Sequence, residues 1–124
     1  MSGNARPKAV AVGVQLPGVS DAEHASSQDE LARLAKTLGY DVVARLSQKR
    51  SALAPGAVLG EGKLEELVRI AACCEAVLVD HEITPSQARN LEKATGQEVL
   101  DRTAVILAIF HRHARSREAR LQVE

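Results

Sequence analysis

The sequence predicts an α/β domain: a four-stranded parallel open sheet with flanking helices and a truncated C-terminal helix. Short valine-rich runs alternate along the chain with longer segments whose apolar residues recur at helical spacing. Aromatic residues make up only 2% of the 124 residues, so small aliphatic side chains build the core, as in closely packed helix and sheet layers. This alternation favours right-handed crossovers, and we expect the strands to be ordered second, first, third, fourth across the sheet.

The first half of the chain contains two strands and one helix. Residues 8–14 are apolar on both faces, as expected of a strand covered by helices on each side. A loop rich in glycine, proline and serine is expected over 15–26. Ser27 then opens the pattern Ser-Gln-Asp-Glu, a capping box that starts a helix, and Gly39 is a natural end for that helix. The second strand is expected over 41–46.

The second half repeats this alternation. A helix is expected over 63–73, and a third strand, again apolar on both faces, over 76–80. Thr84 opens Thr-Pro-Ser-Gln, which combines a capping threonine with a proline and a glutamine at their preferred positions in a first helical turn. That helix is expected to end at Gly96, before a short fourth strand over 98–101.

The last helix is expected to begin with Thr103 as its cap and to change character along its length. Its first half is expected to face the core through Val105, Ile106, Ile109 and Phe110. Its second half is basic, which is typical of a solvated face, of phosphate contacts or of packing on an acidic helix. We therefore divide the chain into a disordered lead (1–7), an α/β domain (8–110) and the start of a longer helical region (111–124).

Charge and cysteine content exclude several classes of protein. Lysine and arginine total 16, as do aspartate and glutamate, so any contact with nucleic acid must be a local patch. With one tyrosine, one phenylalanine and no tryptophan, the chain has no platform for stacking bases. Cys73 and Cys74 are adjacent and form neither a disulfide framework nor a CxxC pair. No secretory signal or run of ~20 apolar residues is present, which indicates a cytoplasmic protein without a membrane span.

The turn Gly60-Glu-Gly-Lys63 is the strongest candidate for nucleotide chemistry. It departs from the phosphate-loop pattern because five residues separate Gly56 from Gly62, and because Leu64 stands where a hydroxyl would hold magnesium. Two glycines and a lysine at the start of a helix suffice to bind one phosphate, of an RNA or of ATP in a small stand-alone nucleotide-binding domain. A plain glycine turn is the alternative.

Other polar segments carry no complete catalytic set. The loop over 47–56 is long and places Lys49 beside Arg50, which suits either a functional loop or a solvated linker. Asp80 and the histidine after it lack the further ligands or the nucleophile that a metal or hydrolase site needs. Asp101 and the arginine after it are typical of a structural ion pair or a helix cap.

Several segments become recognisable when they are taken together. They are, in chain order, Ser47-Gln-Lys-Arg50, Gly60-Glu-Gly-Lys63, Asp80 to Lys93, Asp101 to Leu107, and Ile109 to Glu124. Over nearly its whole length the sequence resembles the N-terminal domain of the HflX family of ribosome-associated GTPases. The resemblance is specific because unrelated motifs fall at the spacing and in the order of the family.

The resemblance implies a function that composition alone does not. Proteins of this family bind the large (50S) ribosomal subunit and take part in splitting stalled or idle ribosomes, and their N-terminal domain reaches ribosomal RNA near the peptidyl-transferase centre. GTP and Mg²⁺ belong to a separate GTPase domain, which these residues do not include and which would be a partner in the full-length protein. This chain alone is therefore expected to bind no cofactor and to catalyse no reaction.

The expected RNA- and ribosome-binding residues come from two sources. Those that match the family's motifs are Gly60, Gly62, Lys63, Pro85, Ser86, Gln87, Arg89 and Asn90. Those that add cationic charge in the loop and in the last helix are Lys49, Arg50, Arg112 and Arg115. Cations concentrated on a neutral domain suit docking on folded RNA by shape and phosphate contacts.

Overall fold

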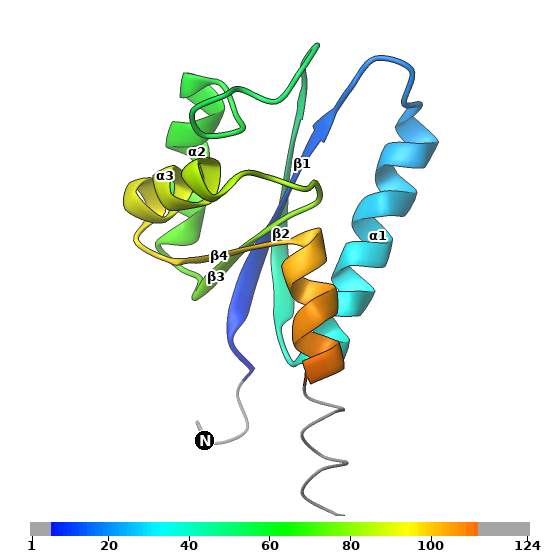
Figure 1. Ribbon diagram of the computed structural model, residues 1–124, viewed down its shortest axis with the longest axis vertical. Coiled ribbons are helices and arrows are strands. Elements are labelled where there is room, and N and C mark those ends of the chain that lie inside the picture. The colour runs from blue at the N-terminus through cyan, green and yellow to red at the C-terminus, as the bar shows by residue number, and fades with distance from the viewer. Residues whose placement is uncertain (1–5, 112–124) are drawn as a thin grey trace, which may run out of the picture.

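Four parallel strands form a single sheet at the centre of the molecule (Figure 1). The computed structural model describes residues 6–111. The strands are β1 (Lys8–Gln15), β2 (Asp41–Lys49), β3 (Ala76–Val79) and β4 (Glu98–Asp101). Every neighbouring pair is parallel, and the order across the sheet is β2-β1-β3-β4. The predicted fold class and strand order are confirmed.

Helices cover both faces of the sheet. Helix α1 (Asp21–Leu38) and the helical residues 102–111 lie against one face, and α2 (Glu61–Ala71) and α3 (Pro85–Thr95) lie against the other (Figure 1). Each face has its own cluster of buried apolar side chains. The central strands are therefore buried on both sides, which explains why β1 and β3 read as continuous apolar runs.

Strand β1 shows how the two layers differ. Successive side chains point to opposite faces of a strand. Ala9 and Ala11 belong to the cluster beneath α1, whereas the valines at 10, 12 and 14 belong to the cluster beneath α2 and α3. A Cβ on Gly13 would lie only 2.8 Å from Nε2 of Gln28, a residue of α1. Small residues on one face of β1 thus let α1 pack close to the sheet.

Helix α1 begins at Asp21, so the prediction that it begins at Ser27 is wrong. Its N-cap is Ser20, whose hydroxyl accepts a hydrogen bond from the amide of Glu23 (3.1 Å), while the Glu23 carboxylate accepts one from the amide of Ser20 (2.9 Å). Ser27 lies within the helix and donates its hydroxyl to Asp80 (2.6 Å). Both serines carry the same local capping pattern, so the pattern alone does not locate the start of the helix.

Other element boundaries differ from the prediction by a few residues. Strand β2 continues to Lys49 because it pairs with β1 along the whole of that strand. Helix α2 spans 61–71 instead of 63–73. Helix α3 has the predicted capping box, with Thr84 as N-cap, and ends at Gly96 in the left-handed conformation that glycine adopts readily.

The helical residues 102–111 contribute less to the core than predicted. Val105 is fully buried, and Ile109 packs at the margin of the α1 cluster. Ile106 and Phe110 are instead 36% and 65% exposed, so the prediction that they face the core is wrong. A helix that rests on one face of a sheet buries only the residues that recur every three or four positions. The predicted basic stretch from residue 112 onward, and residues 1–5 of the predicted lead, lie outside the described residues.

Candidate functional site

The carboxyl ends of the four parallel strands meet at one edge of the sheet, which is where open α/β sheets bind ligands. The connections at this edge span residues 16–20, 50–60 and 80–84, together with the start of the helix at 102. The longest of them joins β2 to α2 and is named here the β2–α2 loop (residues 50–60).

The β2–α2 loop is a folded element. The amide of Ala54 donates to the carbonyl of Val58 (2.9 Å), and the amide of Val58 donates back to the carbonyl of Ala54 (3.0 Å). Val58 has φ 75, a left-handed backbone that β-branched residues rarely adopt, and its side chain is fully buried. Leu59 is also buried. Val58 and Leu59 therefore anchor the end of the loop in the core, whereas the loop predicted over 47–56 begins too early, because β2 continues to Lys49.

Two side chains of α3, one buried and one exposed, bind the loop. Gln87 donates from Nε2 to the carbonyl of Ala54 (3.0 Å), and its Oε1 accepts from the amide of Thr84 (2.9 Å). Asn90 donates from Nδ2 to the carbonyl of Gly56 (2.8 Å). Two of the predicted contact residues of α3 are therefore connected to the loop by hydrogen bonds.

The far end of the loop brings Arg50 against the start of α2. The N-cap of α2 is Gly60, which offers no side chain to the free amides of the first turn. The amide of Gly60 donates to Oε1 of Gln48 (3.0 Å), and a Cβ at this glycine would lie 2.9 Å from Nη1 of Arg50. Lys63 lies in the same first turn and pairs with Glu66 (3.2 Å). Two cations thus flank the positive end of a helix dipole.

Lys49 lies at the rim of this edge. Its Nζ is 3.8 Å from Oδ1 of Asp21, and both side chains are largely exposed, so the pair contributes little to stability. A hydrogen bond from Gln15 and, next, the charge of Lys49 lower the pKa of Asp21. An open hollow of about 450 Å³ separates the connection after β1 from the start of the β2–α2 loop. Lys49 and Arg50 both line it.

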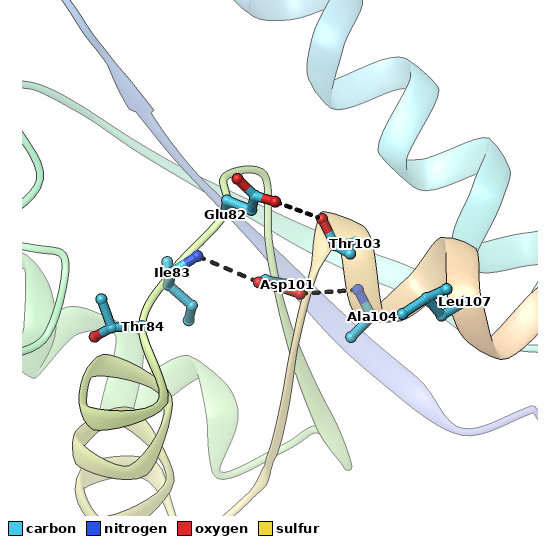
Figure 2. A pocket seen from close by; sticks show the side chains of 7 residues that line it. All are labelled: Glu82, Ile83, Thr84, Asp101, Thr103, Ala104 and Leu107. Atoms are coloured by element: carbon cyan, nitrogen blue, oxygen red, sulfur yellow. Dashed lines mark hydrogen bonds between the residues drawn. The ribbon is translucent and has the colours of Figure 1, made fainter.

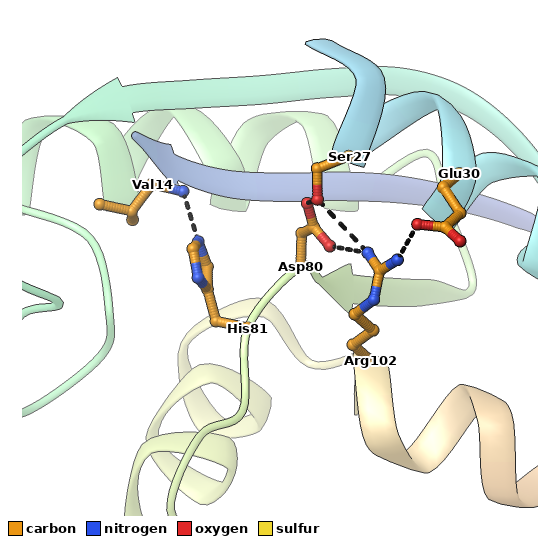
Figure 3. A network of polar contacts seen from close by, with 6 residues as sticks. All are labelled: Val14, Ser27, Glu30, Asp80, His81 and Arg102. Atoms are coloured by element: carbon orange, nitrogen blue, oxygen red, sulfur yellow. Dashed lines mark hydrogen bonds and ion pairs between the residues drawn. The ribbon is translucent and has the colours of Figure 1, made fainter. Parts of the chain in front are cut away.

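A network of polar contacts joins β3, α1 and the last helix (Figure 3). The carboxylate of Asp80 is buried, and its Oδ2 accepts the hydroxyl of Ser27 (2.6 Å). Arg102 forms ion pairs with Asp80 and with Glu30 of α1. The network thus links the first residue of the last helix to α1 and to the residue that follows β3.

His81 is the second polar residue after β3. Its Nε2 accepts a hydrogen bond from the amide of Val14 (2.9 Å; Figure 3), which requires that nitrogen to be unprotonated. Burial lowers the pKa of His81, against the raising effect of Asp80. Among residues 6–111, no three His, Cys, Asp or Glu side chains gather as metal ligands. Asp80 and His81 therefore hold backbone and side-chain partners within the protein.

Asp101 caps the last helix, in place of the predicted Thr103 (Figure 2). Its Oδ1 accepts from the amide of Ala104 (2.8 Å), and its Oδ2 accepts from the amide of Ile83 (3.2 Å). The carboxylate thus links the segment between β3 and α3 to the start of the last helix. These residues border a second open hollow, of about 450 Å³, to which Leu107 contributes an apolar side chain.

Comparison with known proteins identifies the family. The family model described as GTP-binding GTPase N-terminal matches residues 25–111. The chain is 46% identical to the GTPase HflX of Gluconacetobacter diazotrophicus, over 95% of this chain and 35% of that protein. It is 42% identical to the GTPase HflX of Caldanaerobacter subterraneus subsp. tengcongensis, over 86% of this chain and 25% of that protein.

The chain belongs to the HflX family of GTPases. It corresponds to the N-terminal domain, and it spans about a third or less of the length of these relatives. Solved structures share the fold of this HflX domain. A complex of SsGBP with GDP superposes with a TM-score of 0.65 at 21% identity, over 94% of this chain and 32% of that one. A GTP-binding protein from Sulfolobus solfataricus, also with GDP, gives 0.62 at 18% identity, over 83% and 30%.

The predicted contact residues of this HflX domain fall into two groups within the described part of the chain. The first group lies at the end of β2 and the start of α2 and comprises Lys49, Arg50, Gly60, Gly62 and Lys63. The second lies on α3 and comprises Pro85, Ser86, Gln87, Arg89 and Asn90. The β2–α2 loop connects the groups, whereas Arg112 and Arg115 lie outside the described residues. No described helix is both long and apolar enough to cross a membrane.

Sequence reasoning missed the residues that give the loop its shape. No sequence pattern marks Val58 as a turn residue, because valine rarely adopts the left-handed backbone that Val58 has in the structure. Gln48 is not among the predicted contact residues, although it binds the amide at the N-cap of α2. The only available signal was the position of Gln48 immediately before two cations in a motif of the family.

Proposed function

We propose that this chain is the ribosome-contacting domain of an HflX-type GTPase. It associates with the large (50S) ribosomal subunit in the cytoplasm through ribosomal RNA, and it acts in ribosome splitting. GTP and Mg²⁺ are bound by the GTPase domain of the full-length protein, and the residues described here catalyse no step. The proposal combines the family of the chain with the chemistry of one edge of its sheet.

The observation that carries the proposal is the uncapped start of α2. Helix α2 begins without a side-chain cap, and Arg50 and Lys63 lie beside its first turn, which also carries Glu61. Such a helix start suits an anionic oxygen, and RNA presents phosphates at regular spacing. Because the chain has a formal net charge of zero, the attraction comes from this local cluster and not from overall charge.

The same turn is poorly built for nucleotide hydrolysis. Leu64, at the position where a phosphate loop needs a hydroxyl for magnesium, packs against the apolar core. Lys63 pairs with Glu66 instead of extending alone over the turn. Contact with a phosphate backbone requires neither a metal ligand nor a catalytic base, so these features favour binding over chemistry.

Co-sedimentation of the purified chain with large ribosomal subunits over a series of salt concentrations tests the proposal. Binding should weaken as salt rises. Replacing Arg50 and Lys63 by serine should reduce the slope of log affinity against log salt by about one per lost phosphate contact. The matched control replaces Lys36 and Arg69 by serine, which removes two exposed cations remote from the edge and should leave the slope unchanged.

Two outcomes would contradict the proposal. The first is failure of the unaltered chain to sediment with large subunits at low salt. The second is an equal loss of binding in the variant and its control, which would show that the cationic edge has no special role. Calorimetry with ATP tests the alternative that the chain is a small stand-alone nucleotide-binding domain. Micromolar binding of ATP that is lost in Lys63→Ala would identify a nucleotide site at Gly60-Glu61-Gly62-Lys63 instead.

A further inference from the structure

The β2–α2 loop is held by hydrogen bonds at several points along its backbone. Its carbonyl groups at Ala54 and Gly56 are both bound by amide side chains of α3. Its backbone closes on itself through the reciprocal hydrogen bonds of Ala54 and Val58, and Arg50 donates from Nε to the carbonyl of Ala52 (3.1 Å). These contacts span the loop from its beginning to its last turn.

Val58 shows that the loop conformation is imposed on the chain. A left-handed backbone costs a β-branched residue of the order of 1–3 kcal/mol. The burial of its side chain and its two hydrogen bonds with Ala54 compensate for that cost. Strain of this kind persists only where the surrounding structure holds it, and the contacts from α3 supply part of that hold.

We propose that Gln87 and Asn90 are positioning residues, which hold the β2–α2 loop in the shape in which Arg50 and the start of α2 meet RNA. This inference rests on the proposed function, because it assigns these two residues a role in presenting the same contact site. The donor groups of both side chains are already bound to loop carbonyls. Gln87 is also buried, with its oxygen bound to the amide of Thr84.

The physical advantage of such an arrangement is preorganisation. A loop that must become ordered on binding loses part of the interaction free energy to conformational entropy. A loop that is already bound to α3 avoids that loss and presents the Arg50 guanidinium at a fixed distance from the amides of α2. The two α3 residues therefore act on affinity without touching the RNA.

The test uses Asn90→Ala, because Asn90 is exposed and its truncation leaves the core intact. Loss of one hydrogen bond should open the loop about fivefold more often, so the amides of Ala54 and Val58 should exchange hydrogen about fivefold faster. Affinity for large ribosomal subunits should fall by a factor of the same order. Arg89→Ala is the control for exchange, since this neighbouring exposed side chain forms no hydrogen bond with the loop.

A second substitution distinguishes positioning from direct contact. Gly56 has an ordinary backbone conformation, and a Cβ there would meet nothing within 4 Å. Gly56→Ala should therefore stiffen the loop without strain and recover about two- to fivefold of the affinity lost in Asn90→Ala. A direct contact between Asn90 and RNA would not be restored by a methyl group on the loop.

The outcomes separate this inference from the proposed function. If the unaltered chain does not bind large subunits, both are wrong. If it binds, the inference alone is overturned when Asn90→Ala speeds loop exchange without weakening binding. The inference is also overturned when binding weakens while exchange is unchanged, or when Gly56→Ala recovers none of the lost affinity.

Discussion

Replacing Arg102 by methionine removes the cation that neutralises the buried carboxylate of Asp80. Removing one partner of a fully buried ion pair costs ~3–5 kcal/mol, because the remaining charge is left without compensation. The side chain of Asp80 is 4% exposed, but that of Arg102 is 26% exposed, and the hydroxyl of Ser27 still donates to the carboxylate. We therefore expect about half of the full cost, roughly 2 kcal/mol.

Thermal unfolding followed by circular dichroism measures this loss. For a domain of this size, 1 kcal/mol corresponds to about 4 °C, so the Tm of Arg102→Met should fall by about 8 °C. Adding Asp80→Asn removes the orphaned charge and should restore about half of that fall. Arg45→Met is the matched control, because Arg45 pairs with Asp29 (2.6 Å) at an exposed position and should shift Tm by less than about 4 °C.

The reasoning is refuted if Arg102→Met and Arg45→Met lower Tm equally. It is also refuted if the Asp80→Asn double variant is no more stable than the single Arg102 variant. Either result would mean that the carboxylate is hydrated or that the ion pairs of the network contribute no more than surface pairs do.

Three further predictions follow from the packing and the titrating groups. Gly13→Ala should destabilise the fold by about 1–3 kcal/mol in urea unfolding, because its methyl group would lie 2.8 Å from Nε2 of the buried Gln28. At Gly62 an added methyl group would have no atom within 4 Å, so Gly62→Ala should stabilise the fold by about 0.5 kcal/mol. Because the pKa of His81 is lowered in the folded protein, protonation of its ring favours unfolding. The Tm should therefore begin to fall as pH drops through about 6.5 and level off below the lowered pKa. His81→Gln should flatten this dependence of Tm on pH. Burial, followed by the hydrogen bond to a glutamate, raises the pKa of Tyr40 to about 12. Because Tyr40 is the one tyrosine in a chain without tryptophan, ultraviolet absorbance should show it titrating near that value in the folded protein and near 10 in urea. The stability that the raised pKa contributes should be lost above about pH 10. An unperturbed midpoint for Tyr40, a pH-independent Tm or equal effects of the two glycine substitutions would contradict the respective prediction.

The sheet could be predicted from the sequence because the patterns that mark its strands and helices are local and mutually consistent. The apolar runs, the capping box at Thr84 and the glycines at 39 and 96 each specify an element boundary without reference to the rest of the chain. The start of α1 was not readable, because Ser20 and Ser27 present the same pattern. In the structure Ser20 is the cap, and Ser27 lies within the helix, where it donates to Asp80, 53 residues away.

The candidate site was predictable in its position but not in its internal structure. Parallel strands place Lys49, Arg50 and the glycine turn at one edge wherever the strands end. The contacts of Gln87 and Asn90 with the β2–α2 loop join residues more than 30 positions apart, and no local pattern predicts them. Exposure of Phe110 was missed for a related reason, since helical spacing identifies an apolar residue but not whether another element covers it.

The unequal faces of β1 give the two halves of the core different tolerances to substitution. Beneath α1, where Ala9, Ala11 and Gly13 stand, enlarged side chains would force the helix away from the sheet and loosen the attachment of the last helix with it. Beneath α2 and α3 the valines already fill the interface, so the damaging change there is truncation, which would leave voids behind the β2–α2 loop. In a library of β1 variants, smaller side chains should therefore be tolerated at the positions beneath α1, and larger ones at the alternate positions beneath α2 and α3.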